Sequence, residues 1–133
     1  MSVKKIGYFV AKLPNRAGAA AHVLNALRGV NLLAFTGFPV AGGAQVDFIP
    51  QNATAFKAAA KRAKIKLRPK TGGFLIQGGD RPGAIARVMS RLAAAKINVT
   101  AVDAVSAGGG RFGAILWVKP KDAGKAARAL GAR

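Results

Sequence analysis

The chain contains no cysteine and no glutamate, so aspartate supplies all four of its acidic residues. The absence of cysteine excludes disulfides, thiolate metal sites and a cysteine nucleophile. Asp80 and Asp122 lie at predicted helix starts, where capping explains them, whereas Asp47 and Asp103 fall in predicted strands. The single histidine, His22, lies on the outer face of a predicted helix. With no carboxylate pair and no ligand cluster, we expect a non-enzymatic protein without a metal or other cofactor.

Long apolar runs are also missing, because no stretch approaches the ~18 residues of a membrane span. The basic opening, MSVKKIGYFVAKLPN, has its apolar part interrupted by Lys12 and Pro14, and no small-residue cleavage site follows. It therefore resembles a strand rather than a signal peptide. Since cysteine is absent as well, we expect a cytoplasmic protein with no membrane partner.

Basic residues are abundant: 22 Lys and Arg against four acids give a formal net charge of +18. Such a charge attracts polyanions, so nucleic acid is one candidate partner. The densest run, KAAAKRAKIKLRPK, extends from Lys57 to Lys70. It is typical of a solvated helix face, and its alternating lysines predict an edge strand over residues 64–68.

Two segments of the chain are similar to one another, NRAGAAAHVLNALRGVNLLAF at residues 15–35 and GGDRPGAIARVMSRLAAAKINVTAV at residues 78–102. An alignment of Asn15 with Asp80 also aligns Arg16 with Arg81, Gly18 with Gly83, Val23 with Val88, and Leu27 with Leu92. After a two-residue difference in length, VNLLAF aligns with INVTAV. We therefore predict two copies of one unit, residues 1–70 and 71–133, with the TGG at residues 71–73 as the seam.

Hydrophobic spacing changes in the same order within each copy. Alternation in IGYFVAKL and in GFLIQG predicts strands, and apolar residues at i, i+3, i+4 and i+7 predict helices with one buried face. These faces are Ala20, Val23, Leu24 and Leu27 in the first copy and Ile85, Val88, Met89 and Leu92 in the second. Apolar runs around glycine predict hairpins over residues 32–39 with 44–49 and over residues 98–106 with 111–118, each followed by a second helix.

This order predicts an α+β fold of two tandem ferredoxin-like βαββαβ units, with the helices on one face of antiparallel sheets. The second unit lacks its last strand, so its sheet is either short or completed by another segment, for example from a second chain. The core aromatic residues are predicted to be Phe9, Phe35, Phe48, Phe56 and Phe74.

The turn before the first helix of each copy is the candidate site. Asp80 is placed to cap the helix, Pro82 has the φ angle of a first turn, and Gly83 allows backbone or a bound molecule to approach closely. Free N–H groups at such a helix start favour a carboxylate or phosphate. The structural alternative is that D-R-P-G serves only to start a helix.

These residues resemble the ACT domain family. The resemblance rests on [ND]-R-x-G, a helix of about 13 residues, [VI]-N-[LV] and a glycine-containing hairpin, and it covers nearly the whole chain as two copies. It implies a regulatory module in which paired domains hold a small effector, usually an amino acid, between a helix-start loop and a neighbouring strand. The implied ligand-binding residues are Asn15, Arg16, Gly18 and Asn31 in the first copy and Asp80, Arg81, Gly83 and Asn98 in the second.

The chain departs from the family pattern at two positions. Asp80 replaces the loop asparagine and would repel an effector carboxylate, and Ala17 replaces the usual proline. Since no catalytic domain is attached, the resemblance implies a separate regulatory subunit or sensor, with a homodimer and a regulated enzyme as expected partners.

The alternative function is that of a basic RNA- or polyanion-binding protein with the same topology. Residues 110–117, GRFGAILW, are similar to the third-strand motif of RNA-recognition domains. However, the first two residues are in swapped order and Ala114 replaces one stacking aromatic residue. We therefore favour the amino-acid-binding hypothesis over nucleic acid.

Overall fold

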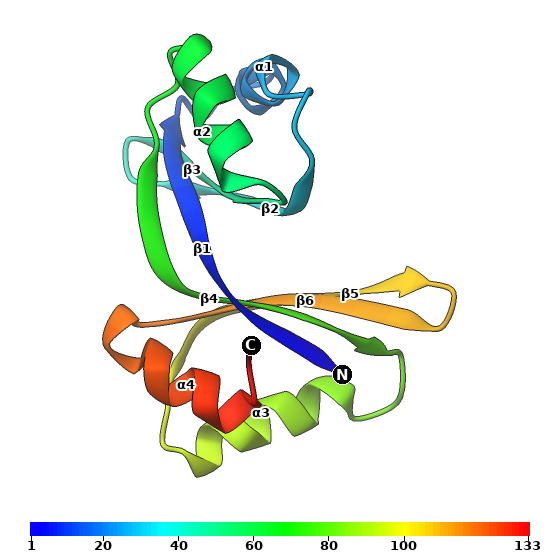
Figure 1. Ribbon diagram of the computed structural model, residues 1–133. Coiled ribbons are helices and arrows are strands. Elements are labelled where there is room, and N and C mark those ends of the chain that lie inside the picture. Colours follow the sequence, from blue (N-terminus) through cyan, green and yellow to red (C-terminus); the bar gives the residue numbers. More distant parts are fainter. The chain divides into compact units, whose positions relative to one another are not determined.

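The computed structural model describes all 133 residues, which form two compact units (Figure 1). The N-unit is Tyr8–Lys70, and the C-unit combines Met1–Gly7 with Thr71–Arg133. The chain is α+β, with strands hydrogen-bonded in the order β2-β3-β1-β4-β6-β5. Its elements are β1 (Ser2–Leu13), α1 (Ala19–Ala26), β2 (Leu32–Val40), β3 (Gly43–Pro50), α2 (Ala53–Arg62), β4 (Arg68–Gly79), α3 (Ala84–Ala94), β5 (Val99–Gly108), β6 (Arg111–Val118), a 3₁₀ turn η1 (Pro120–Asp122) and α4 (Ala123–Leu130). The α+β class is as predicted, and the repeat boundaries stay a prediction.

In the N-unit, β3 pairs antiparallel with both β1 and β2. Phe48 of β3 lies opposite Phe9 on one side and Phe35 on the other. Helices α1 and α2 pack on one face of this sheet through buried residues such as Val23 and Phe56. The rings of Phe48 and Phe56 lie 5.2 Å apart, so the aromatic residues form the centre of the core.

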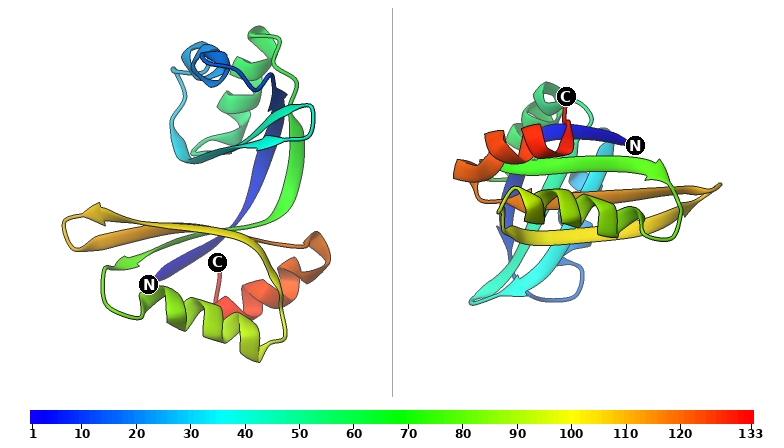
Figure 2. Two further views of the ribbon diagram at one scale, coloured as in Figure 1. Left: turned by 180° about the vertical axis from the view of Figure 1, so that it is seen from behind. Right: turned by 90° about the horizontal axis from the view of Figure 1, so that it is seen from below.

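In the C-unit, β6 pairs antiparallel with β4 and β5, and α3 and α4 cover one face of the sheet (Figure 2). The start of β1 belongs to this unit, because Val3 is buried in the same core as Leu92 and Leu130. The backbone N–H of Lys5 donates to the carbonyl of Arg133, and the N–H of Arg133 donates to the carbonyl of Val3. The sequence left open whether another segment, for example from a second chain, completes the second unit. In the structure the first residues of the same chain pack in this unit.

The predicted edge strand over residues 64–68 is wrong, because α2 ends at Arg62 and β4 begins only at Arg68. Lys64 adopts a left-handed conformation with φ 59°, and the N–H of Ile65 donates to the carbonyl of Ala60 at 2.9 Å. This arrangement is a Schellman end to the helix. The apolar residues that alternate with lysine pack against the N-unit core without joining a sheet.

The predicted seam at residues 71–73 lies inside a strand, since β4 runs without interruption to Gly79. Glycine is needed at residue 72 because φ is +96° and a Cβ would lie 2.4 Å from the carbonyl oxygen of Val118. Glycine in a strand often marks such a close approach of another backbone segment.

Candidate functional site

The turn that precedes α1 has the same geometry as the turn that precedes α3. The N–H of Ala19 donates to the carbonyl of Arg16 at 3.3 Å, and Gly18 has φ 84° and ψ −10°. In the C-unit the N–H of Ala84 donates to the carbonyl of Arg81 at 3.2 Å. These features define type II turns, in which the third residue requires a positive φ and is therefore usually glycine.

Gly83 has φ 80° and ψ 5°, which match the third position of a type II turn, and Pro82 occupies the second position, where proline is common. A Cβ on either turn glycine would meet no atom within 4 Å. The space beside both turns is therefore open, and the backbone conformation is what requires glycine.

Asp80 does not cap α3, so this prediction is wrong. The helix begins at Ala84 after the type II turn and has no side-chain cap. The Asp80 carboxylate instead accepts a hydrogen bond of 2.7 Å from the hydroxyl of Ser106 on β5. The backbone N–H of Asp80 also donates to the carbonyl of Gly110. Asp122, the other predicted cap, makes no side-chain capping bond at the start of α4.

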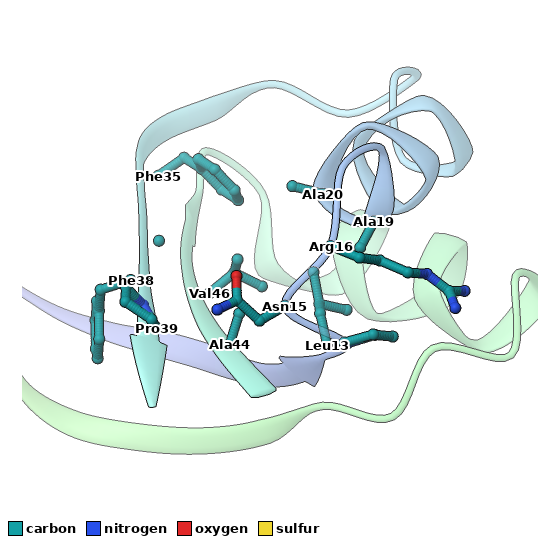
Figure 3. Close-up of a pocket in the computed structure, with 12 residues that line it drawn as sticks. Leu13, Asn15, Arg16, Ala19, Ala20, Phe35, Phe38, Pro39, Ala44 and Val46 are labelled. Atoms are coloured by element: carbon teal, nitrogen blue, oxygen red, sulfur yellow. The ribbon is translucent and has the colours of Figure 1, made fainter. Parts of the chain in front are cut away.

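A pocket of about 320 Å³ lies beside the first turn, within the N-unit (Figure 3). We call it the N-pocket. Its lining comes from the end of β1, the turn, the start of α1, β2 and β3: Leu13, Pro14, Asn15, Arg16, Ala19, Ala20, Phe35, Gly37, Phe38, Pro39, Ala44 and Val46. Most of these side chains are apolar, and the volume is in the range of small-molecule sites.

The polar side chains of the N-pocket point in different directions. Figure 3 shows the amide of Asn15 directed into the space between β2 and α1, whereas the guanidinium of Arg16 extends away from it. The Asn15 side chain makes no hydrogen bond within the chain. An amide offers both donors and an acceptor, so it is free to bind a ligand of either polarity.

A corresponding pocket of about 400 Å³, the C-pocket, lies beside the second turn. It is lined by Asp80, Arg81, Gly83, Ala84, Ile85, Ala86, Ala104, Val105, Ser106 and Phe112. The bond between Asp80 and Ser106 connects the turn to the edge strand β5. A smaller pocket of about 210 Å³ adjoins it and includes Arg81 and Arg87. Both copies of the motif therefore open onto a cleft within their own unit.

Asn31 and Asn98 do not lie at these pockets. Because β1 and β2 both pair antiparallel with β3, they run parallel to each other, and Asn31 precedes the end of β2 that is far from the turn. The Asn31 amide donates to the side-chain oxygen of Gln51 at 3.0 Å. Asn98 is exposed before β5, in the corresponding place. Their role as ligand-binding residues stays a prediction.

The N-unit contains one acidic residue, Asp47 of β3, which is 5% exposed. Its carboxylate accepts hydrogen bonds from the hydroxyl of Thr36 and from the amide of Gln45. Burial raises the pKa of the Tyr8 hydroxyl above its usual value, and the negative charge of Asp47 raises it further. Since Val46 lines the N-pocket and successive side chains of a strand point to opposite faces, the Asp47 carboxylate faces away from the pocket.

Most residues that line these pockets were not among the predicted site residues. Phe35 was predicted to be in the core, but it is 36% exposed and lines the N-pocket. Its ring is tilted against the core ring of Phe48, with the two ring centroids 5.3 Å apart. Phe38, Val105 and Ser106 were likewise not predicted to lie at the site. The sequence did hold one signal: Phe35 and Phe38 are three residues apart, so in a strand they point to opposite faces, and both rings cannot be buried in one core.

The strand that is similar to an RNA-recognition motif does not present a stacking surface. Phe112 of β6 is 6% exposed and packs in the C-unit core with Phe74 and Leu116. Base stacking requires exposed aromatic rings. The basic run, in contrast, is exposed at all seven of its charged residues, Lys57, Lys61, Arg62, Lys64, Lys66, Arg68 and Lys70.

No family model matches the chain, and no curated protein matches it. Solved structures, however, are similar over nearly its whole length. Protein BT0572 from Bacteroides thetaiotaomicron is similar over 97% of this chain and 88% of that one, with a TM-score of 0.80 and 18% identity. The ligand-free regulatory subunit of aspartate kinase from Thermus thermophilus is similar over 98% and 93%, with a TM-score of 0.65 and 18% identity.

The aspartate kinase of Clostridium acetobutylicum is a further neighbour, with a TM-score of 0.54 and 14% identity over 97% of this chain and 32% of that enzyme. At these identities the likeness establishes the fold. The chain is ACT-domain-like in its fold, as the motifs predict, and its neighbours include regulatory subunits of aspartate kinases. No helix of the chain has the length and apolar character needed to cross a membrane.

Proposed function

We propose that the chain is a non-catalytic regulatory module of two tandem ACT-like units that binds a small amino acid beside its helix-start turns. The observation that carries the proposal is the presence of an open pocket at the same motif in both units. The similarity to regulatory subunits of aspartate kinases supports a regulatory role and an enzyme as the regulated partner.

The chemistry of the N-pocket suits a zwitterion. The Asn15 amide can donate to an α-carboxylate and accept from an α-ammonium group, and Ala20 places a first-turn N–H of α1 at the pocket wall. Arg16 adds positive charge at the rim, which favours a carboxylate. In the C-pocket the corresponding groups are Asp80, Arg81 and the turn at Gly83.

Effector binding has to change something else if the module regulates an enzyme, and we propose that it changes domain pairing. The edge strand β5 is exposed along almost its whole length, carries Asp103 as its one charged residue, and leaves Val105 68% exposed. Edge strands that must stay unpaired usually carry charged residues, especially lysine, and β5 has no lysine or arginine. We propose a second copy of the chain as the partner of this edge, with Val105→Lys expected to shift the population from dimer to monomer in analytical ultracentrifugation.

A thermal-shift screen of the twenty amino acids tests the binding proposal. An effector at a hundred times its Kd stabilises the folded state by ~2.7 kcal/mol. The shift should disappear in Asn15→Ala and persist in Asn25→Ala, which removes an exposed amide from the outer side of α1. If none of the amino acids raises the melting temperature of the wild type, the proposal is wrong.

Polyanion binding is a second candidate, favoured by the exposed basic run from Lys57 to Lys70. Without a stacking surface, binding would depend on phosphate attraction alone and would weaken steeply with salt. Fluorescence anisotropy with a short single-stranded RNA at two salt concentrations separates this candidate from the first. Binding that survives moderate salt would favour it.

A further inference from the structure

The two pockets occupy the same place in their units but differ in chemistry. When Asn31 is aligned with Asn98, Pro39 aligns with Ser106 and Phe38 aligns with Val105. In the C-pocket the acid of the turn is bound to Ser106. In the N-pocket the proline has no hydroxyl to offer, and the turn residue is the neutral Asn15.

The walls of the N-pocket are apolar. Phe35 is one of the few large apolar side chains that the chain leaves exposed, at 36%. Figure 3 shows its ring on the pocket side of β2, where Phe35, Leu13 and Val46 border the space into which the Asn15 amide points. The ring of Phe38 lies on the other side of the strand, on the face where Thr36 bonds Asp47. Covering the exposed part of the Phe35 ring with an apolar ligand group is favourable. The exposure of this ring is therefore explained if a ligand side chain packs on it.

The N-pocket has no partner for a cationic ligand side chain. The single acid of the N-unit, Asp47, is buried, bonded to Thr36 and Gln45, and turned to the opposite face of β3. The charged side chain at the pocket rim is that of Arg16, which would repel an ammonium group. A lysine effector would therefore leave its ammonium group unpaired against apolar walls, which is costly.

From these observations we infer that the N-pocket takes an amino acid with an apolar, branched or aromatic side chain, and that the C-pocket does not bind the same ligand. This inference rests on the proposed function and names the class of effector for one of its two sites. The side chain packs on Phe35 and Val46, and the amide of Asn15 binds the polar end. One effector is bound per chain.

The test is isothermal titration calorimetry on the full chain with L-leucine, L-phenylalanine, L-lysine and L-aspartate. We expect leucine or phenylalanine to bind at one site per chain, with lysine and aspartate about tenfold weaker or more. Phe35→Ala should weaken the apolar ligand about tenfold. Leu33→Ala, which truncates another exposed residue of β2 outside the pocket, should leave the affinity unchanged. Since both side chains are exposed, circular dichroism should show that both variants stay folded.

The possible results separate the inference from the proposed function. If lysine or aspartate binds most tightly and Asn15→Ala removes binding, the chain still binds an amino acid and the inference about its side chain is wrong. If leucine binds but Phe35→Ala has no more effect than Leu33→Ala, or if two equivalent sites are measured, the assignment to the N-pocket is wrong. If none of the four ligands binds and the screen of the remaining amino acids is also negative, the proposed function itself fails.

Discussion

Substitution of Gly18 by alanine tests the turn on which the N-pocket depends. A Cβ at this residue would meet no atom within 4 Å, so contact with neighbours adds no cost. The cost comes from φ +84°, a left-handed conformation that disfavours a residue with a Cβ by about 1–2 kcal/mol. Alanine also lowers the conformational entropy of the unfolded chain, which offsets this cost by about 0.4–1 kcal/mol. We therefore expect the free energy of unfolding to fall by about 1 kcal/mol, which urea denaturation measures.

Gly29→Ala is the matched control. Its Cβ would also meet no atom within 4 Å, but its φ lies outside the left-handed region. The same reduction in unfolded-state entropy should then leave this variant as stable as the wild type or about 0.4–1 kcal/mol more stable. The difference between the two variants corresponds to a shift in Tm on the order of 4 °C or more for a chain of this size. Equal stability of Gly18→Ala and Gly29→Ala would refute the type II turn.

Three further predictions follow from local contacts. Asn52→Ala removes the side-chain oxygen that caps α2 and should lower the free energy of unfolding by about 1 kcal/mol in urea; no change would show that the cap is not formed. Gly72→Ala should destabilise far more than Gly18→Ala in the same assay, because its Cβ would overlap the carbonyl oxygen of Val118; equal effects would contradict the close approach. Since the folded-state pKa of Tyr8 lies above 10.0, the protonated phenol stabilises the fold below that pH, and this contribution is lost as pH rises through the folded-state pKa. The free energy of unfolding should therefore fall less at alkaline pH in Tyr8→Phe than in the wild type. If it falls equally with pH in both proteins, the raised pKa of Tyr8 is contradicted.

Periodic patterns predicted the elements of this fold well. The helix faces around Val23, Leu27, Val88 and Leu92 are buried as expected. Apolar residues spaced three and four positions apart lie on the same face of a helix, so the pattern identifies the buried face directly. The hairpins also lie where glycine separates two apolar runs. The α+β class followed from these elements, because amphipathic helices after strands must pack on a sheet face.

The errors came from residues whose environment depends on distant parts of the chain. The alternation of apolar and polar residues does not reveal that β2 is an edge strand of the sheet. Phe35 was therefore predicted to be in the core, although its side chain is partly exposed at this edge. Ile65 and Leu67 alternate with lysine as in a strand, yet they pack beside a helix end. A local pattern cannot distinguish these two ways of burying an apolar side chain.

The candidate site was predictable in part. The turn motif identified Asn15, Arg16 and Gly18 because turn chemistry is local. Phe38 comes from a strand more than twenty residues later, and only the sheet brings it beside the turn. Ser106 reaches Asp80 in the same way, so the difference between the two pockets could be seen only in the structure.

The most direct test of the account is a ¹H–¹⁵N correlation spectrum of the chain titrated with L-leucine. The account predicts saturable shifts at the amides of residues 15–20 and of residues 35–38, which line the N-pocket from the turn and from β2. Amides around the C-pocket should not change. A spectrum that stays unchanged with leucine and with L-phenylalanine, or one whose changes lie away from the Asn15 turn, would contradict the account.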